Sequence, residues 1–394
     1  MFMRRIQPLF VFLLLFVFTA IACAAPKNVI LFIGDGMGHA HIAAARISTL
    51  GQGGRLTIEK MPVTGMHTTH SANALVTDSA AGATALACGV KTNNYTVSKS
   101  PDGRRVRSIL EASRTIGKAT GVVTTTSVTD ATPAAFTSHV DERGMQPEIA
   151  GQQLDVNIDV LMGGGRAYFL PEGDDGYRSD SRNLLSEAAA KGYIVVTTAE
   201  ELNKVNSGRV LGLFAMEKLT TQSPEPSLSE MTKKAIQILS QDTDGFFLMV
   251  EGGQIDSYAH RNDLDGMVRQ LIEFDKAVAE GLSFAQQNGD TLVVVTADHE
   301  TGGLTLLSDD EGNLGPSWST GGHSGIMVPV FAFGPESQRF TGLMDNTDIS
   351  KKIGAVWGIK VGLFDVSDDD KTADSVRIKH EYSKSAAVAA SSTR

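Results

Sequence analysis

The sequence predicts an α/β fold, in which a mostly parallel central β-sheet is flanked by helices on both faces and carries small loop insertions near its functional edge. Three observations support this prediction. Short apolar or β-branched runs alternate with segments whose apolar residues recur at helical spacing. Acidic and histidine side chains follow several of the apolar runs, as is typical of sites at the carboxyl edge of a parallel sheet. The composition, with 42% hydrophobic and 20% charged residues, is that of a globular protein.

Five short apolar runs are predicted to be strands, namely residues 28–33, 122–126, 246–251, 292–296 and 327–333. Five further segments are predicted to be helices, namely residues 80–88, 105–116, 182–190, 228–239 and 263–287. In the longest of these, apolar residues recur every three or four positions and define one helical face. Residues 308–319 are rich in Gly, Asp and Ser, so we expect a surface loop or hairpin near the mouth of the site.

The chain is expected to comprise a signal peptide over residues 1–24, a single folded domain over 25–367 and a polar tail over 368–394. The end of the tail is predicted to be disordered because it is small and polar. No internal repeat or interior domain boundary is evident in the sequence. The net charge of −10 argues against a nucleic-acid partner.

The N-terminal segment has the layout of a secretory leader. Arg4 and Arg5 precede a 14-residue apolar run, and small residues then allow cleavage after Ala24. The run is too short to cross a bilayer comfortably, so a periplasmic or secreted location is expected, with a membrane anchor as the alternative. Cys23 also leaves a lipid-anchored form open. Loss of Cys23 would leave Cys88 without a partner, and no intramolecular disulfide is then expected.

Six acidic or histidine side chains lie at or just beyond the ends of predicted strands: Asp35, Glu251, Asp256, His260, Asp298 and His299. In a parallel sheet these ends share one edge, so residues more than 260 positions apart can meet there. Mixed carboxylates and imidazoles suit zinc, whereas an all-oxygen position suits magnesium. The pattern therefore predicts a metalloenzyme.

Ser79 begins the predicted helix 80–88, and Gly89 follows that helix in the position of a C-terminal cap. Unpaired N–H groups and the helix dipole favour an anion such as phosphate at this end. A serine in this place is usually only an N-cap. Metal ligands in the same chain favour a second interpretation, because a bound cation can activate a hydroxyl as a nucleophile.

Six segments, in this order, resemble the alkaline phosphatase family: FIGDGMG (32–38), VTDSAA (76–81), DATPAA (130–135), VEGGQID (250–256), TADHE (296–300) and GGHS (321–324). They cover the chain from about residue 28 to about residue 335. The resemblance implies two zinc ions and one magnesium ion. The ligands that it implies are, for the first zinc, Asp256, His260 and His323; for the second, Asp35, Ser79, Asp298 and His299; and for magnesium, Asp35, Thr132 and Glu251.

The resemblance also implies that Arg143 grips the substrate phosphate. Two positions near the implied metals vary within the family and lie outside the ligand set. Asp130 stands where some members have histidine, and Ser257 stands where relatives often carry Lys, His or Trp. Serine removes a positive charge near the phosphate and alters the surroundings of the third metal, which affects magnesium and product binding.

The resemblance thus implies an exported phosphomonoesterase that hydrolyses small phosphate monoesters through a phosphoserine on Ser79 and releases inorganic phosphate. Family members are often homodimers, so a homodimer is compatible with it. A phosphodiesterase or sulfatase of the same superfamily is the alternative enzyme, although such relatives commonly lack the third-metal ligands. A non-catalytic phosphate-binding protein would need neither Ser79 nor two zinc sites. The remaining histidines are interpreted as surface or packing residues: His39, His41, His67, His70, His139 and His380.

Overall fold

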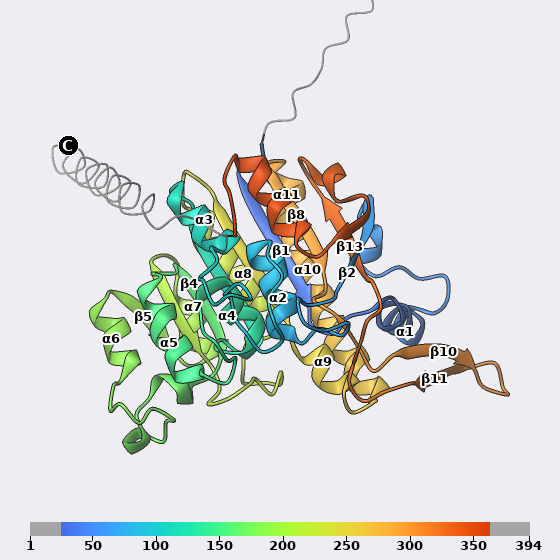
Figure 1. Cartoon of the computed structure of the whole chain (residues 1–394), viewed down its shortest axis with the longest axis horizontal. Helices are drawn as coiled ribbons and strands as arrows, with labels where there is room; N and C mark the ends of the chain where they lie inside the picture. The colour runs from blue at the N-terminus through green and yellow to red at the C-terminus, as the bar shows by residue number, and fades with distance from the viewer. Residues whose placement is uncertain (1–24, 363–394) are drawn as a thin grey trace, which may run out of the picture.

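The computed structural model describes residues 25–362 and is built around one ten-stranded sheet (Figure 1). The expected signal peptide and the whole of the expected tail lie outside the described residues. In spatial order the strands are β14 (Gly342–Asp345), β2 (Val63–Thr68), β13 (Val328–Phe333), β8 (Thr291–Thr296), β1 (Asn28–Gly34), β7 (Phe246–Gly252), β3 (Ala119–Ser127), β4 (Val160–Gly164), β6 (Arg209–Leu213) and β5 (Tyr193–Val196).

The sheet is mostly parallel, which confirms the predicted fold class. Only β13 runs against its neighbours β2 and β8, and every other pair in the sheet is parallel. All five predicted strands are present, and the run 122–126 extends to Ala119–Ser127. The central strand β1 is buried along its whole length, because both its neighbours and the helices above and below cover it.

Helices cover both faces of the sheet. They are α1 (His39–Leu50), α2 (Ser79–Cys88), α3 (Ile109–Thr115), α4 (Ala131–Thr137), α5 (Gln146–Asp155), α6 (Leu184–Ala190), α7 (Ala199–Lys204), α8 (Leu228–Leu239), α9 (Gln254–Ala259), α10 (Leu264–Asn288) and α11 (Asp348–Trp357). Side chains of β1 alternate between the faces. Ile30 and Phe32 join a core with α1, α8 and α10, whereas Leu31 and Ile33 join a second core with α2, α3, α4 and α11.

Helix ends follow the local sequence. α3 begins at Ile109 rather than at residue 105, because the Ser108 hydroxyl accepts the Glu111 N–H and the Glu111 carboxylate accepts the Ser108 N–H. α2 ends at Cys88, and the next residue, Gly89, has a φ of 66°, the left-handed conformation expected of a C-terminal cap. Four short 3-10 helices complete the helical elements of residues 25–362: η1 (Ile58–Lys60), η2 (Arg166–Phe169), η3 (Glu172–Asp174) and η4 (Ser337–Phe340).

A hairpin of β10 (Leu304–Ser308) and β11 (Leu314–Trp318) projects from the body at the lower right of Figure 1. This is the loop or hairpin predicted over 308–319, and it begins four residues earlier. It lies between the short strands β9 (Glu300–Thr301) and β12 (His323–Ser324), which pair with each other. Within residues 25–362, no helix combines the length and the hydropathy needed to cross a membrane.

Candidate active site

Four adjacent strands in the middle of the sheet carry the predicted site residues at their carboxyl ends. The register places Ile33 of β1 beside both Glu251 of β7 and Thr296 of β8. Asp35 therefore follows β1 at the level where Asp298 follows β8. Thr132 comes from α4, directly after β3, which pairs with β7. The single edge expected from a parallel sheet thus collects residues from four separate segments of the chain.

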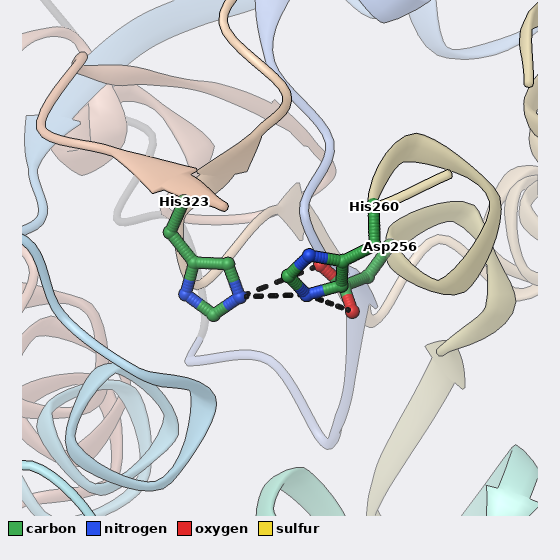
Figure 2. A group of neighbouring side chains, drawn as sticks. All are labelled: Asp256, His260 and His323. Carbon is green, nitrogen blue, oxygen red and sulfur yellow. Dashed lines mark hydrogen bonds and ion pairs between the residues drawn. The ribbon is translucent and has the colours of Figure 1, made fainter. Parts of the chain in front are cut away.

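Asp256, His260 and His323 form the first group (Figure 2). One ligand atom from each lies within 4.8 Å of the other two. The Nε2 atoms of the two histidines are 3.2 Å apart, and His260 Nε2 is 3.3 Å from Asp256 Oδ2. Asp256 and His260 reach the same point because they are four residues apart on the turn of α9.

Main-chain carbonyls orient both of these histidines. His260 Nδ1 lies 2.7 Å from the Gly321 carbonyl, and His323 Nδ1 lies 2.9 Å from the Thr77 carbonyl. A carbonyl only accepts, so Nδ1 carries the proton in each ring and Nε2 presents its lone pair to the site. Positive charge between these two Nε2 atoms and the carboxylate stabilises the arrangement. The hydrogen bond to Asp256 accordingly raises the pKa of His260 to about 9, and zinc, which fits this donor set, would take the place of that proton.

His299 is the centre of the second group and is fully buried. Its Nε2 lies 3.2 Å from the Ser79 hydroxyl, 3.2 Å from Asp298 Oδ2 and 3.4 Å from Asp35 Oδ1. The structure thus brings together all four residues that the resemblance implied for the second zinc. Asp35, Asp256 and His299 also have ligand atoms within 4.8 Å of one another, so Asp256 lies between the two groups.

Three carboxylates of this edge resist ionisation unless positive charge lies between them. The fourth, Asp256, does not, because the hydrogen bond from His260 and the nearby histidines outweigh burial and lower its pKa. Burial raises the pKa of Asp35 well above its usual value, and the charges of Asp298, Asp256 and Glu251 raise it further. Burial and the charge of Asp256 raise the pKa of Asp298 to about 7, and burial raises that of Glu251 to about 8. A bound divalent cation would offset this repulsion and keep the carboxylates ionised.

Three buried oxygens of this edge have no hydrogen-bond partner among the described residues: Asp35 Oδ1, Asp298 Oδ2 and Thr132 Oγ1. Unpaired buried oxygens are costly unless they coordinate an ion. Glu251 Oε2 lies nearby on β7 and accepts hydrogen bonds from the Thr124 and Thr126 hydroxyls of β3. Carboxylate and hydroxyl oxygens are the ligands that magnesium prefers. The residues implied for the third site, Asp35, Thr132 and Glu251, therefore fit magnesium.

Ser79 is the first residue of α2, as predicted, and is almost completely buried. The N-cap is Asp78, whose side chain accepts the Ala81 N–H at 3.0 Å. The Ser79 hydroxyl therefore takes no part in capping the helix. Arg143 lies beside this helix end, with its guanidinium 3.2 Å from Asp78 Oδ2 and 2.9 Å from Asp130 Oδ1. These carboxylates outweigh the effect of burial and raise the pKa of Arg143 above its usual value.

The other predicted residues are placed as follows. Asp130 contacts Arg143 directly. Ser257 is partly exposed on α9 and makes no side-chain hydrogen bond with any of residues 25–362. His139 packs between Glu111 and the Ser98 carbonyl, and His67 packs against the Ala297 carbonyl, which agrees with their interpretation as packing residues.

Sequence reasoning missed several groups that surround the ligands. Thr301 donates to Asp256 Oδ1, Thr124 donates to Glu251, and Glu300 accepts from the turn after β9. Glu300 and Thr301 directly follow the recognisable Asp298-His299 pair, and this closeness in sequence could have indicated their place at the site. Thr124 stands in a run of three threonines within a strand, and such a run is also ordinary β-sheet composition.

Comparisons with known proteins agree with this geometry. The family model for alkaline phosphatase matches residues 26–317. The chain is 35% identical over 408 aligned residues to alkaline phosphatase 4 of Bacillus subtilis, covering 82% of this chain and 87% of that protein. It is 37% identical to streptomycin-6-phosphate phosphatase of Streptomyces griseus, covering 86% and 92%. The solved alkaline phosphatase of the Antarctic bacterium TAB5 is 38% identical, with a TM-score of 0.79, covering 84% and 98%.

The fold and these comparisons together define a phosphomonoesterase built on a mostly parallel α/β sheet. The chain belongs to the alkaline phosphatase family, as its six motifs predicted. Its relatives extend to a structure from Thermus thermophilus that is 26% identical at a TM-score of 0.79, covering 89% of this chain and 96% of that one. A variant of the TAB5 enzyme with histidine changed to aspartate has magnesium bound in its M3 site.

Proposed function

We propose that this alkaline phosphatase hydrolyses small phosphate monoesters in two displacements, through a phosphoserine on Ser79, with two zinc ions and one magnesium ion bound at the site. The observation that carries the proposal is the position of the Ser79 hydroxyl. It lies 3.2 Å from His299 Nε2, at the start of α2 and beside the residues that hold Arg143. The proposal includes export after removal of residues 1–24.

Each metal would have its own ligand set in this chain: Asp256, His260 and His323 for the first zinc; Asp35, Ser79, Asp298 and His299 for the second; and Asp35, Thr132 and Glu251 for magnesium. Such cations lower the pKa of a nearby hydroxyl or water and neutralise the charge of a phosphate. Magnesium bound in the M3 site of the TAB5 variant supports magnesium as the third ion. This chain has an acidic residue, Asp130, two positions before the proposed ligand Thr132.

Residues of the protein supply the nucleophile and bind the phosphate oxygens during the two displacements. Ser79 Oγ attacks phosphorus in line, its proton passes to solvent, and the ester P–O bond breaks as the departing oxygen takes up a proton. Water then attacks the phosphoserine, restores the Ser79 hydroxyl and releases inorganic phosphate. Arg143 can bind two phosphate oxygens in a fork, and the free N–H groups of α2 can hold the third. Two inversions predict net retention at phosphorus.

Substrate comparison tests the proposal directly. Purified protein should hydrolyse an aryl phosphate much faster than the matching diester or sulfate, and metal analysis of the same sample should find zinc and magnesium. A preference for the diester or the sulfate would contradict the assigned substrate class. Binding of phosphate without turnover of any of the three would instead identify a non-catalytic protein.

Replacement of the nucleophile tests the covalent step. Ser79→Ala should lower turnover by several orders of magnitude and abolish labelling of the protein by a radioactive phosphate ester at acidic pH. The fold should persist, because the cap of α2 is the Asp78 side chain and not Ser79. Ser227→Ala, at the N-terminus of α8, is the control and should label normally. Near-normal turnover of the Ser79 variant would sink the covalent mechanism.

A further inference from the structure

Glu300 is a buried carboxylate that has no part in the proposed chemistry. Its exposed fraction is 3%, and it directly follows His299 in the chain. A buried carboxylate is retained at such a place only when several donors satisfy it. The donors around Glu300 lie in the turn that follows β9 and on β12, the strand that carries His323.

Three hydrogen bonds satisfy Glu300. Oε1 accepts the Leu304 N–H at 3.1 Å, and Oε2 accepts the Gly303 N–H at 3.2 Å and the Ser324 hydroxyl. His41 Nε2 lies 4.0 Å from Oε1, which is beyond hydrogen-bonding distance. Burial lowers the pKa of His41 to about 4, so this ring is neutral at pH 7 and does not balance the charge of Glu300. The carboxylate therefore depends on its three donors.

These donors join the two short strands of the site. Glu300 pairs with Ser324, and Thr301 pairs with His323, in the two-residue ladder of β9 and β12. His299 precedes this ladder and His323 is part of it, so one ladder positions a ligand of each proposed zinc. A ladder of two residues is too short to be rigid by itself. The bond from Ser324 to Glu300 adds a side-chain link between the same two strands.

The loop that carries Asp35 also packs on Glu300. A Cβ at Gly38 would lie 2.4 Å from Glu300 Cγ, so glycine is required for the loop to approach this closely. Glu300, itself on β9, thus contacts two further segments that carry proposed ligands, the β1–α1 loop and β12.

We propose that Glu300 is a positioning residue that holds His299 and His323 in register with the Asp35 loop and thereby slows the release of zinc from the site. This inference rests on the zinc assignment of the proposed function. Glu300 touches neither substrate nor metal in this arrangement. It acts through the backbone of the turn at residues 303–304 and through the hydroxyl of Ser324.

Glu300→Gln is the principal test. The amide keeps the volume of the carboxylate but replaces one oxygen with an NH2 group, which then faces Leu304 N–H or the Gly303 and Ser324 donors. Loss of a group that hydrogen-bonds a metal ligand typically weakens metal binding by roughly 10- to 100-fold, and Glu300 acts one step further out, so the lower end of this range is expected. We therefore expect zinc to pass from the variant to a chromogenic chelator roughly tenfold faster than from the natural protein. The absorption spectrum of the cobalt-substituted variant should also shift, because it reports ligand geometry.

Ser324→Ala is the second variant and removes only one of the three donors. It should accelerate zinc release in the same direction and by a smaller factor. Asp275→Asn is the matched control, since Asp275 is another buried carboxylate, on α10, and accepts the Thr57 and Ile58 N–H groups at 2.9 Å at the start of η1. This control should lower the unfolding temperature while leaving zinc release and the cobalt spectrum unchanged.

Two results would overturn the inference, and a third, distinguishable result would contradict the proposed function itself. Glu300→Gln with natural zinc release and an unchanged cobalt spectrum would overturn the inference, even if the variant were less stable. Equal acceleration in Asp275→Asn would also overturn it, because the effect would then be a general loss of stability. If the natural protein itself takes up no zinc, the proposed function fails first, and that result is visible before any variant is compared.

Discussion

Arg143 illustrates at the scale of one residue how the site is prepared for an anion. Its guanidinium is held by Asp78 and Asp130, so its direction is set before a substrate arrives. Both carboxylates belong to segments next to the site, because Asp78 precedes Ser79 and Asp130 precedes α4. A preoriented arginine loses less conformational entropy when it binds two phosphate oxygens.

Arg143→Ala should weaken inhibition by inorganic phosphate by roughly 10- to 100-fold, since charge-assisted hydrogen bonds contribute about 1.5–3 kcal/mol. Zinc content should stay unchanged, because a guanidinium has no lone pair to offer a metal. Phosphate inhibition constants and metal analysis of the same preparations check both statements. Arg182→Ala, which removes an exposed charge paired with Glu187, serves as the control. Loss of zinc with unchanged phosphate inhibition would show that Arg143 is misassigned.

Ser257 follows the proposed zinc ligand Asp256 on α9 and offers a neutral, partly exposed hydroxyl. A lysine there would add attraction to a bound phosphate, partly screened by water. Ser257→Lys should therefore tighten inhibition by phosphate and slow turnover if product release is limiting. Ser186→Lys on α6 makes the same change in net charge elsewhere. Equal or weaker inhibition in the Ser257 variant, measured at one pH, would reject the idea.

At the scale of elements, the start of α3 is tied to the segment after α4. Glu111 caps α3 and also binds His139 Nε2 at 2.8 Å, while His139 Nδ1 binds the Ser98 carbonyl. Burial opposes the charge on each partner, yet their mutual attraction prevails: the pKa of His139 is raised and that of Glu111 is lowered. One side-chain pair thus joins three segments that cover the same face of the sheet.

This pair predicts a pH-dependent stability. A raised histidine pKa contributes fully below about pH 6.5 and is lost as pH rises through the pKa of the folded protein, whereas a lowered glutamate pKa contributes above about pH 4.5. His139→Gln, which keeps a neutral hydrogen bond, should lower the free energy of unfolding by about 1–2 kcal/mol at pH 5.5 and by much less at pH 10. Urea unfolding of both proteins at the two pH values measures this. A difference that does not change with pH would contradict the charged pair.

The elements that sequence patterns predicted are those with strong local signals. β1, β7 and β8 are continuous apolar runs buried on both faces, and α10 has a long amphipathic repeat. β2 and β14 were not predicted, because β2 mixes Thr, Gly and His and β14 has only four residues at the edge of the sheet. The place of β2 in the sheet depends on pairing with β13, and that of β14 on pairing with β2, rather than on their own composition.

At the scale of the whole molecule, the site depends on one edge that collects distant segments. Motif resemblance predicted which side chains meet there, because most of the proposed ligands stand within one of the six motifs. It could not predict the carbonyls of Gly321 and Thr77 or the donors of Glu300, since main-chain direction in loops depends on tertiary packing. Cys88 is a buried free thiol, so it provides no cross-link between these segments.

Removal of metal should therefore destabilise the whole domain. Ions that bind only the folded protein stabilise it by roughly 4 kcal/mol at a thousand times the dissociation constant. Dialysis against a chelator should abolish activity and lower the unfolding temperature by several degrees, and zinc with magnesium should restore both. Differential scanning calorimetry with and without metals is the measurement. An unfolding temperature that is the same in both samples would show that the ions have no structural role.

The β10–β11 hairpin enters and leaves the site between two paired strands, and this makes it a natural place for the chain to change length. Gly302 N–H binds the Gly322 carbonyl at 2.8 Å, so the ends of the excursion are joined at its base. Beyond that base, residues 309–313 are exposed. Each doubling of such a loop changes closure entropy by only about 0.6 kcal/mol. Longer segments could therefore be inserted at residues 309–313 without displacing His299 or His323, which flank the hairpin in the sequence. Protein engineers could use this position to add residues beside the catalytic edge.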